Sequence, residues 1–246
     1  MIDKGMLFKQ ELDTKWIKGL SNGTSLHELV DTTRVIPKAK KLKRICCCDG
    51  RCPRHGEEIF LAGSGILMDI SALEMFIKEN EIEVITSHFD CGAGRLAYSL
   101  LSTEEQAKYL NAEDYVQKWG KEISEKFGLK YEYISETDLT APEHYEMGII
   151  IDTTYDFHTL LFDGTPNFFI TNAARFASEQ YITTEVSVLA DIGLGPHGFG
   201  SFFNSDTPFY ILIAARSREE AVKLIHLCEE ARLKYQNEIT IDLLNF

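Results

Sequence analysis

Two short segments of the sequence gather the residue types that bind a metal ion. The first is Ile45-Cys46-Cys47-Cys48-Asp49-Gly50-Arg51, and the second is His88-Phe89-Asp90-Cys91-Gly92. Each follows a predicted strand, and in open α/β sheets ligands bind at the carboxyl ends of strands. Two such ends could place Cys47, His88 and Cys91 around one point. Two thiolates and one imidazole suit zinc and leave a fourth position open, as in a catalytic site.

The alternation of side chains along a strand sorts the residues of the first segment. If the chain stays extended, Cys47, Asp49 and Arg51 share one face. Cys46 and Cys48 then point to the other face, where we expect them to behave as small buried apolar residues. Asp49 could accept a hydrogen bond from a zinc-bound hydroxide or swing in as a fourth ligand, and Arg51 could hold its carboxylate by a charge-assisted fork. The alternative is a structural ion pair at a strand end, beside buried cysteines and a core histidine.

Strands and helices in alternation must position these residues. Apolar runs bounded by turn residues predict strands, and apolar residues at helical spacing predict helices. The expected strands cover residues 43–48, 57–62, 82–86, 131–134, 147–153, 209–214 and 238–243. The expected helices cover residues 25–33, 71–80, 92–101, 102–127 and 217–235. This alternation predicts an α/β fold with a central, mainly parallel β-sheet flanked by helices.

The final third of the chain has a different composition. Residues 166–200 are rich in Gly, Asn, Thr and aromatic residues, and the sequence shows no internal repeat. We therefore expect a zinc domain over residues 1–160 and an additional C-terminal α/β extension over residues 161–246. The extension would pack on the same sheet or form the oligomer interface.

Length and charge narrow the class of protein. The chain has 246 residues and a formal net charge of −13, from 25 basic and 38 acidic side chains. An acidic surface repels phosphate backbones, so we expect no nucleic-acid partner. No stretch reaches the ~20 apolar residues that span a bilayer, so we expect no membrane partner. The charged first residues lack the apolar core of a secretory signal, and clustered cysteines fit a reducing compartment, so we expect a cytoplasmic protein.

The sequence resembles the β-class carbonic anhydrases over roughly residues 35–130. Their pattern is Cys-x-Asp-x-Arg followed by His-x-x-Cys-Gly, and this chain has Cys47-x-Asp49-x-Arg51 and then His88-x-x-Cys91-Gly92. Residues 60–65, Phe-Leu-Ala-Gly-Ser-Gly, stand where the family keeps a small-residue loop beside the metal. The resemblance implies a β-carbonic-anhydrase-like sheet, zinc on Cys47, His88 and Cys91, and a catalytic dyad of Asp49 and Arg51.

The resemblance also implies an activity and a state of assembly. The expected reaction is the reversible hydration of carbon dioxide to bicarbonate by a zinc-bound hydroxide. The expected enzyme is a carbonic anhydrase-type zinc lyase in a homodimer or larger homo-oligomer. His55 and His197 are candidate proton carriers because histidine titrates near neutral pH. Two alternatives stay open: a hydrolase of CS2 or COS on the same zinc site, and a non-catalytic zinc-containing binding or sensor module.

Overall fold

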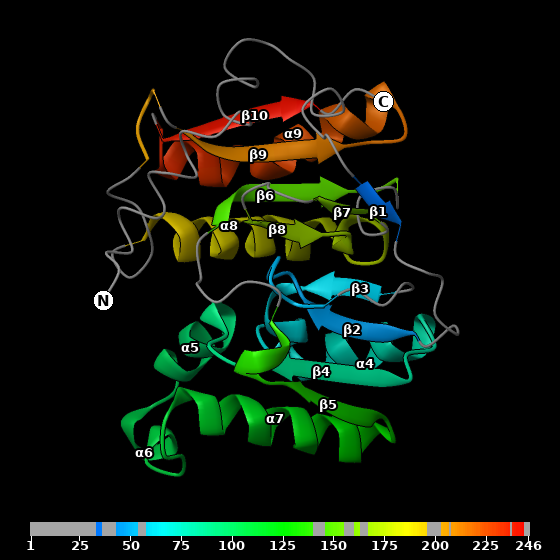
Figure 1. Ribbon diagram of the computed structural model, residues 1–246, viewed down its shortest axis with the longest axis vertical. Coiled ribbons are helices and arrows are strands. Elements are labelled where there is room, and N and C mark those ends of the chain that lie inside the picture. Colours follow the sequence, from blue (N-terminus) through cyan, green and yellow to red (C-terminus); the bar gives the residue numbers. More distant parts are fainter. Residues whose placement is uncertain are drawn as a thin grey trace. The chain divides into compact units, whose positions relative to one another are not determined.

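Figure 1 shows the computed structural model of the chain, in which strands alternate with helices. The structure describes residues 33–35, 43–53, 58–139, 146–154, 160–162, 167–195, 203–206, 208–236 and 238–243. The helix expected over residues 25–33 lies outside them except for Thr33, which begins a strand. The two candidate proton carriers, His55 and His197, also lie outside the described residues.

The chain divides into two compact units. Unit 1 comprises Met1–Ile36, Tyr145–Ile170 and Ile182–Phe246, and unit 2 comprises Pro37–His144 and Thr171–Tyr181. The fold is α/β with parallel strands, as expected, but it has two four-stranded sheets in place of one central sheet. The sequence pattern missed this because an apolar run does not specify which strand will lie beside it. The domain boundary expected at residue 160 stays a prediction.

The sheet of unit 2 consists of β2 (Arg44–Cys47), β3 (Glu58–Leu61), β4 (Val84–His88) and β5 (Lys130–Ile134). The strands lie in the order β3-β2-β4-β5, and all neighbours are parallel. From β3 the chain crosses over to β4 on the other side of β2, so the strand order reverses between β2 and β4. Such a reversal opens a crevice for ligands at the carboxyl ends of the two strands.

Helices and helical turns join these strands. The 3-10 turn η1 (Ala62–Gly65) and α4 (Ile70–Glu79) lie between β3 and β4 in the chain. Three helices lie between β4 and β5: α5 (Gly92–Ser99), α6 (Thr103–Gln106) and α7 (Ala112–Phe127). A second 3-10 turn, η2 (Glu136–Asp138), follows β5. The pattern over residues 102–127 predicts one helix, but Asn111 starts a new one because its side chain accepts a hydrogen bond from Asp114 N.

The core of unit 2 lies on the strands and the helix faces that cover them. Every residue of β2, β3 and β4 is buried, as expected for parallel strands covered on both faces. Helix α4 buries Leu73, Phe76 and Ile77, which recur at helical spacing along one side. Helix α7 contributes Val116 and Ile123. The site residues at the strand ends therefore sit on a rigid, apolar support.

The sheet of unit 1 consists of β6 (Glu146–Asp152), β8 (Asn167–Thr171), β9 (Phe209–Ala214) and β10 (Ile239–Leu243). The order is β10-β9-β6-β8, and β9 is parallel to both β6 and β10. In Figure 1 the arrow of β8 points the same way as that of β6. Three helical segments connect these strands: η3 (Ala173–Arg175) and α8 (Glu179–Leu194) before β9, and α9 (Arg218–Lys234) before β10. A separate antiparallel pair joins β1 (Thr33–Val35) to β7 (Leu160–Phe162).

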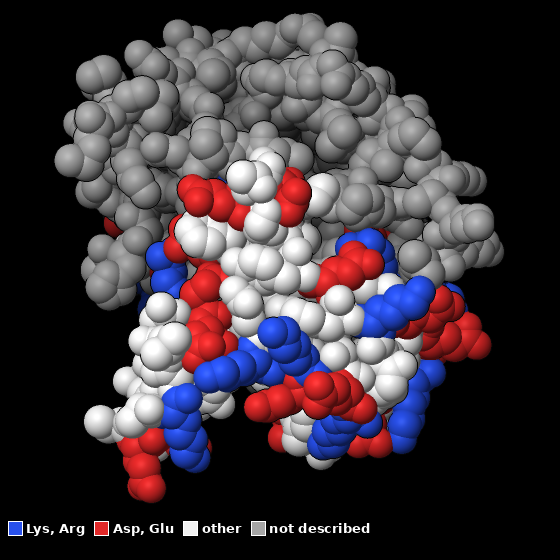
Figure 2. Space-filling model, turned by 60° about the horizontal axis from the view of Figure 1, so that its bottom comes forward, with Lys and Arg blue, Asp and Glu red and all other residues white. Residues whose placement is uncertain are grey.

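Charged side chains of both signs are intermingled over the described part of the face shown in Figure 2. Several oppositely charged residues pair within one helix, as Lys78 does with Glu74 and Lys118 with Asp114. Exposed pairs of this kind contribute little to stability. Among the described residues, no helix has both the length and the apolar character that crossing a bilayer requires.

Candidate metal centre

The ends of β2 and β4 bring three potential metal ligands together. Cys47 is the last residue of β2, and His88 is the last residue of β4. Cys91 follows three residues later and caps the amino end of α5. One ligand atom from each side chain lies within 4.8 Å of the other two. The convergence expected from the sequence is therefore present, and the group could hold a metal ion.

The two sulfur atoms have a spacing that fits a tetrahedral ion. Cys47 Sγ and Cys91 Sγ are 3.9 Å apart, and no disulfide joins these two cysteines. Two thiolates that each lie ~2.3 Å from a tetrahedral ion are about 3.8 Å apart. A disulfide bond would need roughly half this separation. The donor set and its spacing thus fit zinc.

His88 presents one ring nitrogen for a further interaction. Its Nδ1 lies 2.9 Å from the carbonyl oxygen of Phe89, which accepts a hydrogen bond when Nδ1 carries the proton. Nε2 then keeps its lone pair, as in most histidines that bind metals. This Nε2 atom is buried and has no hydrogen-bond partner among the described residues. A metal ion would supply the missing interaction, which buried polar atoms in proteins rarely lack.

The charges around the site favour a cation. The hydrogen bond with Cys91 and burial raise the pKa of the Cys47 thiol well above its ordinary value. Burial lowers the pKa of His88, but attraction to Cys47 and Asp49 outweighs burial and raises this pKa to about 9. Two thiolates in a buried site repel each other, and a divalent cation removes that repulsion. Metal binding must therefore release protons from these side chains.

Asp49 and Arg51 form a buried ion pair beside the three ligands. Arg51 Nη2 donates to Asp49 Oδ2 at 2.7 Å, and Arg51 Nε donates to Oδ1 at 3.0 Å. Both side chains are only 2% exposed. Asp49 Oδ2 also lies 3.9 Å from His88 Nδ1, so the pair borders the ligand group. The expected fork between guanidinium and carboxylate is present.

A turn, rather than an extended strand, makes this pair. The alternation of side chains assumed an extended chain through Arg51, but β2 ends at Cys47. Arg51 N donates to Asp49 Oδ1 at 2.9 Å, which is the hydrogen bond of an Asx turn. Cys46 and Cys48 are buried, as expected. Cys46 is not purely apolar in its contacts, because its Sγ lies 3.5 Å from a carboxylate oxygen of Glu58.

Small residues let the backbone pack closely around Cys91. Gly94 N donates a hydrogen bond to Cys91 Sγ at 3.4 Å. A Cβ atom on Gly94 would lie only 2.2 Å from Val116 Cγ2, so α5 and α7 can approach this closely only with glycine here. A Cβ atom on Gly63 would lie 3.0 Å from Ala93 Cβ. The small-residue loop expected beside the metal is thus the turn η1, and it packs against the start of α5.

A glutamate of α7 holds the turn between His88 and Cys91. Asp90 lies in this turn with a φ of 57°, a strained value for a residue with a side chain. Its backbone N donates to Glu113 Oε2 at 3.1 Å, and Tyr133 donates its hydroxyl to Glu113 Oε1 at 2.7 Å. Glu113 therefore helps to fix the step between two ligands. Sequence reasoning missed it, because an acidic residue in the first turn of a helix is ordinary.

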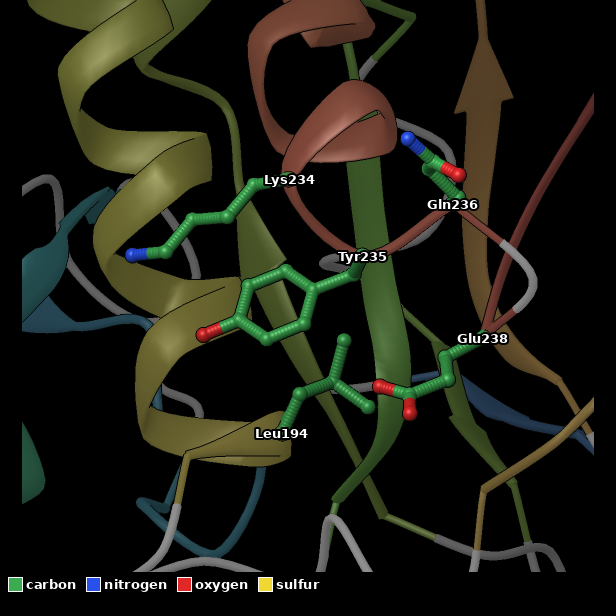
Figure 3. Close-up of a pocket in the computed structure, with 5 residues that line it drawn as sticks. All are labelled: Leu194, Lys234, Tyr235, Gln236 and Glu238. Atoms are coloured by element: carbon green, nitrogen blue, oxygen red, sulfur yellow. The ribbon is translucent and has the colours of Figure 1, made fainter.

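A hollow of about 460 Å³ in unit 1 is lined by Leu194, Lys234, Tyr235, Gln236 and Glu238. Figure 3 shows Lys234 and Tyr235 pointing toward α8. There the carboxylate of Asp191 accepts hydrogen bonds from both side chains, at 2.7 and 2.8 Å from Lys234 and at 2.7 Å from Tyr235. Because these two polar groups are engaged with Asp191, the hollow does not suggest a second active site.

Comparison of the chain with models of protein families, with curated proteins and with solved structures found no match. The chemistry of the site itself therefore has to carry the functional conclusion.

Proposed function

We propose that the protein is a zinc enzyme that reversibly hydrates carbon dioxide to bicarbonate. One observation carries the proposal: two thiols and one imidazole converge in a buried group, with the ion pair of Asp49 and Arg51 beside it. This donor set suits zinc and leaves a fourth position open. The order and spacing of these residues resemble the β-class carbonic anhydrases, in which the same residue types serve the same reaction.

The three ligands and the ion pair have separate tasks in the proposed reaction. A zinc ion held by Cys47, His88 and Cys91 would lower the pKa of water and so make a nucleophile available near neutral pH. Asp49 would accept a hydrogen bond from the attacking water and orient it. Arg51 holds the carboxylate in place through its guanidinium and its backbone N. The guanidinium also places a positive charge directly beside this carboxylate.

The proposal includes a location and a state of assembly. Six cysteines, four of them clustered within seven residues, fit a reducing compartment, and we infer a cytoplasmic location from them. A homodimer or larger homo-oligomer is part of the same proposal, and the mass of the particle in solution would test it. The substrate is a small molecule, carbon dioxide in one direction and bicarbonate in the other.

The test combines metal analysis with stopped-flow hydration of carbon dioxide. The parent protein should contain one zinc ion per chain and hydrate carbon dioxide. Asp49→Ala should keep the zinc and lose on the order of 10²-fold in rate or more, the usual contribution of a positioned proton acceptor. Asp242→Ala is the matched control, because Asp242 is an exposed carboxylate of unit 1, and its rate should stay unchanged.

Other outcomes would favour other functions. Zinc without any turnover in the parent protein would favour the binding or sensor module. Release of sulfide from CS2 or COS at a much higher rate than hydration would favour the hydrolase. A purified protein that neither contains zinc nor takes it up would overturn the proposal.

A further inference from the structure

The two units repeat one strand order, although the sequence shows no internal repeat. In unit 2 the second strand along the chain, β3, lies at one edge of the sheet beside the first strand, β2. The third and fourth strands, β4 and β5, lie on the other side of β2, which gives the order β3-β2-β4-β5. The sheet strands of unit 1 do the same, giving β8-β6-β9-β10. After the second strand of each sheet the chain forms a 3-10 turn and then a helix, and helical segments separate the third strand from the fourth (Figure 1). The turn η3 and the start of α8, which follow β8, belong to unit 2.

The ends of the third strands align the two units residue by residue. In unit 2, β4 ends at His88, and Cys91 caps the next helix three residues later. In unit 1, β9 ends at Ala214, and Ser217 caps the next helix three residues later. Both caps accept a hydrogen bond from the backbone N of the residue three positions on. Ala214 and Ser217 therefore occupy the positions of His88 and Cys91.

The pairing of neighbouring strands locates the third ligand position. In unit 2, Ile45 pairs with Ile85, so Cys47, two residues further on, lies level with the residue before the end of β4. In unit 1, Ile151 pairs with Ile213, which is also the residue before the end of its strand. Ile151 thus occupies the position of Cys47.

Unit 1 has a different set of contacts around these positions. Glu220 is the third residue of its helix, where unit 2 has Gly94. The Glu220 carboxylate accepts a hydrogen bond from Thr153 Oγ1 at 2.8 Å and another from Arg216 Nη2 at 2.6 Å. Thr153 lies two residues after Ile151, as Asp49 lies two residues after Cys47 in unit 2. A salt-bridged carboxylate here ties the strand end to the helix, which is the task that a metal ion would perform in unit 2.

We infer that unit 1 is a second copy of the metal-binding frame, with Ile151, Ala214 and Ser217 at the three ligand positions. The inference rests on the proposed function, because the ligands of unit 2 define those positions. A butyl group, a methyl group and a hydroxyl replace the thiolates and the imidazole that suit zinc. The protein therefore binds one zinc ion per chain, and replacing side chains alone restores a second site.

Restoring the ligands and counting the ions tests the inference. The variant combines Ile151→Cys, Ala214→His, Ser217→Cys and Glu220→Gly, the residue types of unit 2 at the same positions. After dialysis against zinc and removal of free metal, the zinc content should rise from one ion per chain to two. The matched control has Ile150→Cys in place of Ile151→Cys, which turns the thiol to the opposite face of the strand. Its zinc content should stay at one.

The parent protein separates this inference from the proposed function. One ion in the parent and two in the variant support both. One ion in each, with a folded variant, overturns the inference and leaves the proposed function standing. Adding Cys91→Ser to the variant removes a ligand of the unit 2 site. Uptake of one ion by this protein would show that the new site binds zinc without the unit 2 site. A parent with no ion overturns the proposed function and the inference with it, because the ligands of unit 2 define the three positions.

A second measurement needs no metal. Ile151→Cys with Ser217→Cys, in a chain that also carries Cys47→Ser and Cys91→Ser, should place two sulfurs near the 3.9 Å seen in unit 2. Diamide takes two electrons and two protons from such a pair, so a disulfide forms and the azo oxidant becomes a hydrazine. Peptide mapping should find the link between positions 151 and 217 in most chains, and not with Ile150→Cys. A folded variant without the link would overturn the inference.

Discussion

Gly94→Ala should weaken metal binding as well as the fold, because the new methyl group has no room. Its Cβ atom would lie 2.2 Å from Val116 Cγ2, whereas carbon atoms in contact stay ~3.5–4.0 Å apart. Helices α5 and α7 must therefore separate by on the order of 1 Å. The same Cβ atom would lie 3.4 Å from Cys91 Cβ and 3.6 Å from Cys91 Sγ, so the displacement reaches a ligand.

The size of the effect follows from opposing contributions. Overpacking a core costs about 1–3 kcal/mol in the free energy of unfolding. Alanine is better than glycine in a helix by about 1 kcal/mol, which offsets part of this loss. Metal affinity has no such offset, because a bound ion tolerates only ~0.2 Å of error in its ligand distances. We expect zinc affinity to fall about 10–100-fold, the usual effect of disturbing the residues that support a ligand.

Two assays and two further variants separate these effects. Competition with a chromophoric chelator measures zinc affinity, and urea unfolding of the metal-free protein measures stability. Gly193→Ala is the matched control, because its Cβ atom would lie 2.6 Å from Phe209 Cε2 in unit 1. It should lose stability and keep zinc affinity. Adding Val116→Ala to Gly94→Ala removes the clashing Cγ2 atom and should restore most of the affinity.

Two results would contradict a link between the packing of α5 on α7 and the metal site. If Gly94→Ala loses as much stability as Gly193→Ala but keeps the parent's zinc affinity, the packing of α5 on α7 does not position Cys91. If Val116→Ala fails to restore the affinity, the methyl group acts by a route other than the contact with Val116.

Three further predictions concern the turn, the metal and the carboxylate of unit 1. Glu113→Ala should lower zinc affinity about 10–100-fold because it removes the acceptor for the Asp90 amide, and Glu113→Gln, which keeps one acceptor oxygen, should restore most of it. Parent affinity in the alanine variant, measured by chelator competition, would contradict this role. Removing the metal with EDTA should lower the midpoint of thermal unfolding, since a ligand at 100 times its Kd stabilises by about 2.7 kcal/mol. Cys91→Ser should show no such change, and an unaffected parent would speak against bound metal. Hydrogen bonds from Arg216 lower the pKa of Glu220 from 4.5 to about 2, so its contribution to stability is complete above pH 4.5 and is lost as the pH falls toward 2. The slope is at most about 1.4 kcal/mol per pH unit. The difference between the parent and Glu220→Gln in urea unfolding should therefore shrink as the pH falls from 5 to 3, and a constant difference would show that Glu220 does not titrate in this way.

Local patterns predicted the elements whose apolar residues follow a clear period. The strand expected at residues 209–214 is β9, and the helix expected at residues 217–235 is α9. The strand expected at residues 82–86 ends two residues before β4 does, because Ser87 and His88 are polar, although both are buried. A polar residue after an apolar run is usually taken as the start of a turn. A metal site at the end of a strand needs polar side chains within the strand itself, so the strand continues past the point where the apolar run stops.

Helix α8 shows where local preference misleads. The sequence predicted no helix at residues 179–194, where Thr183, Thr184 and Val188 have weak helix propensity because their side chains branch at Cβ. The structure has a helix there, with Val186 and Leu189 among its buried residues. Packing of one face against the rest of the protein outweighs a small unfavourable preference at each position.

The candidate site also has one part that the sequence predicts and another that it does not. The three-residue step from His88 to Cys91 is visible in the sequence because a strand end and a helix cap are close along the chain. The contact of Glu113 with Asp90 joins residues 23 positions apart, and nothing in the local sequence marks it. The repeated strand order of the two units has no sequence signature either, because pairing depends on the path of the whole chain.

The depth of the three ligands bears on how an ion enters and leaves. Cys47, His88 and Cys91 are 5%, 1% and 3% exposed, so a chelator in solvent has no direct approach to them. Exchange must wait for a strand end or the start of α5 to open locally. Release should therefore proceed at the opening rate, independent of chelator concentration once chelator is in excess. An ion captured while the chain folds would stay with the protein through purification, and a different metal would enter most readily during refolding.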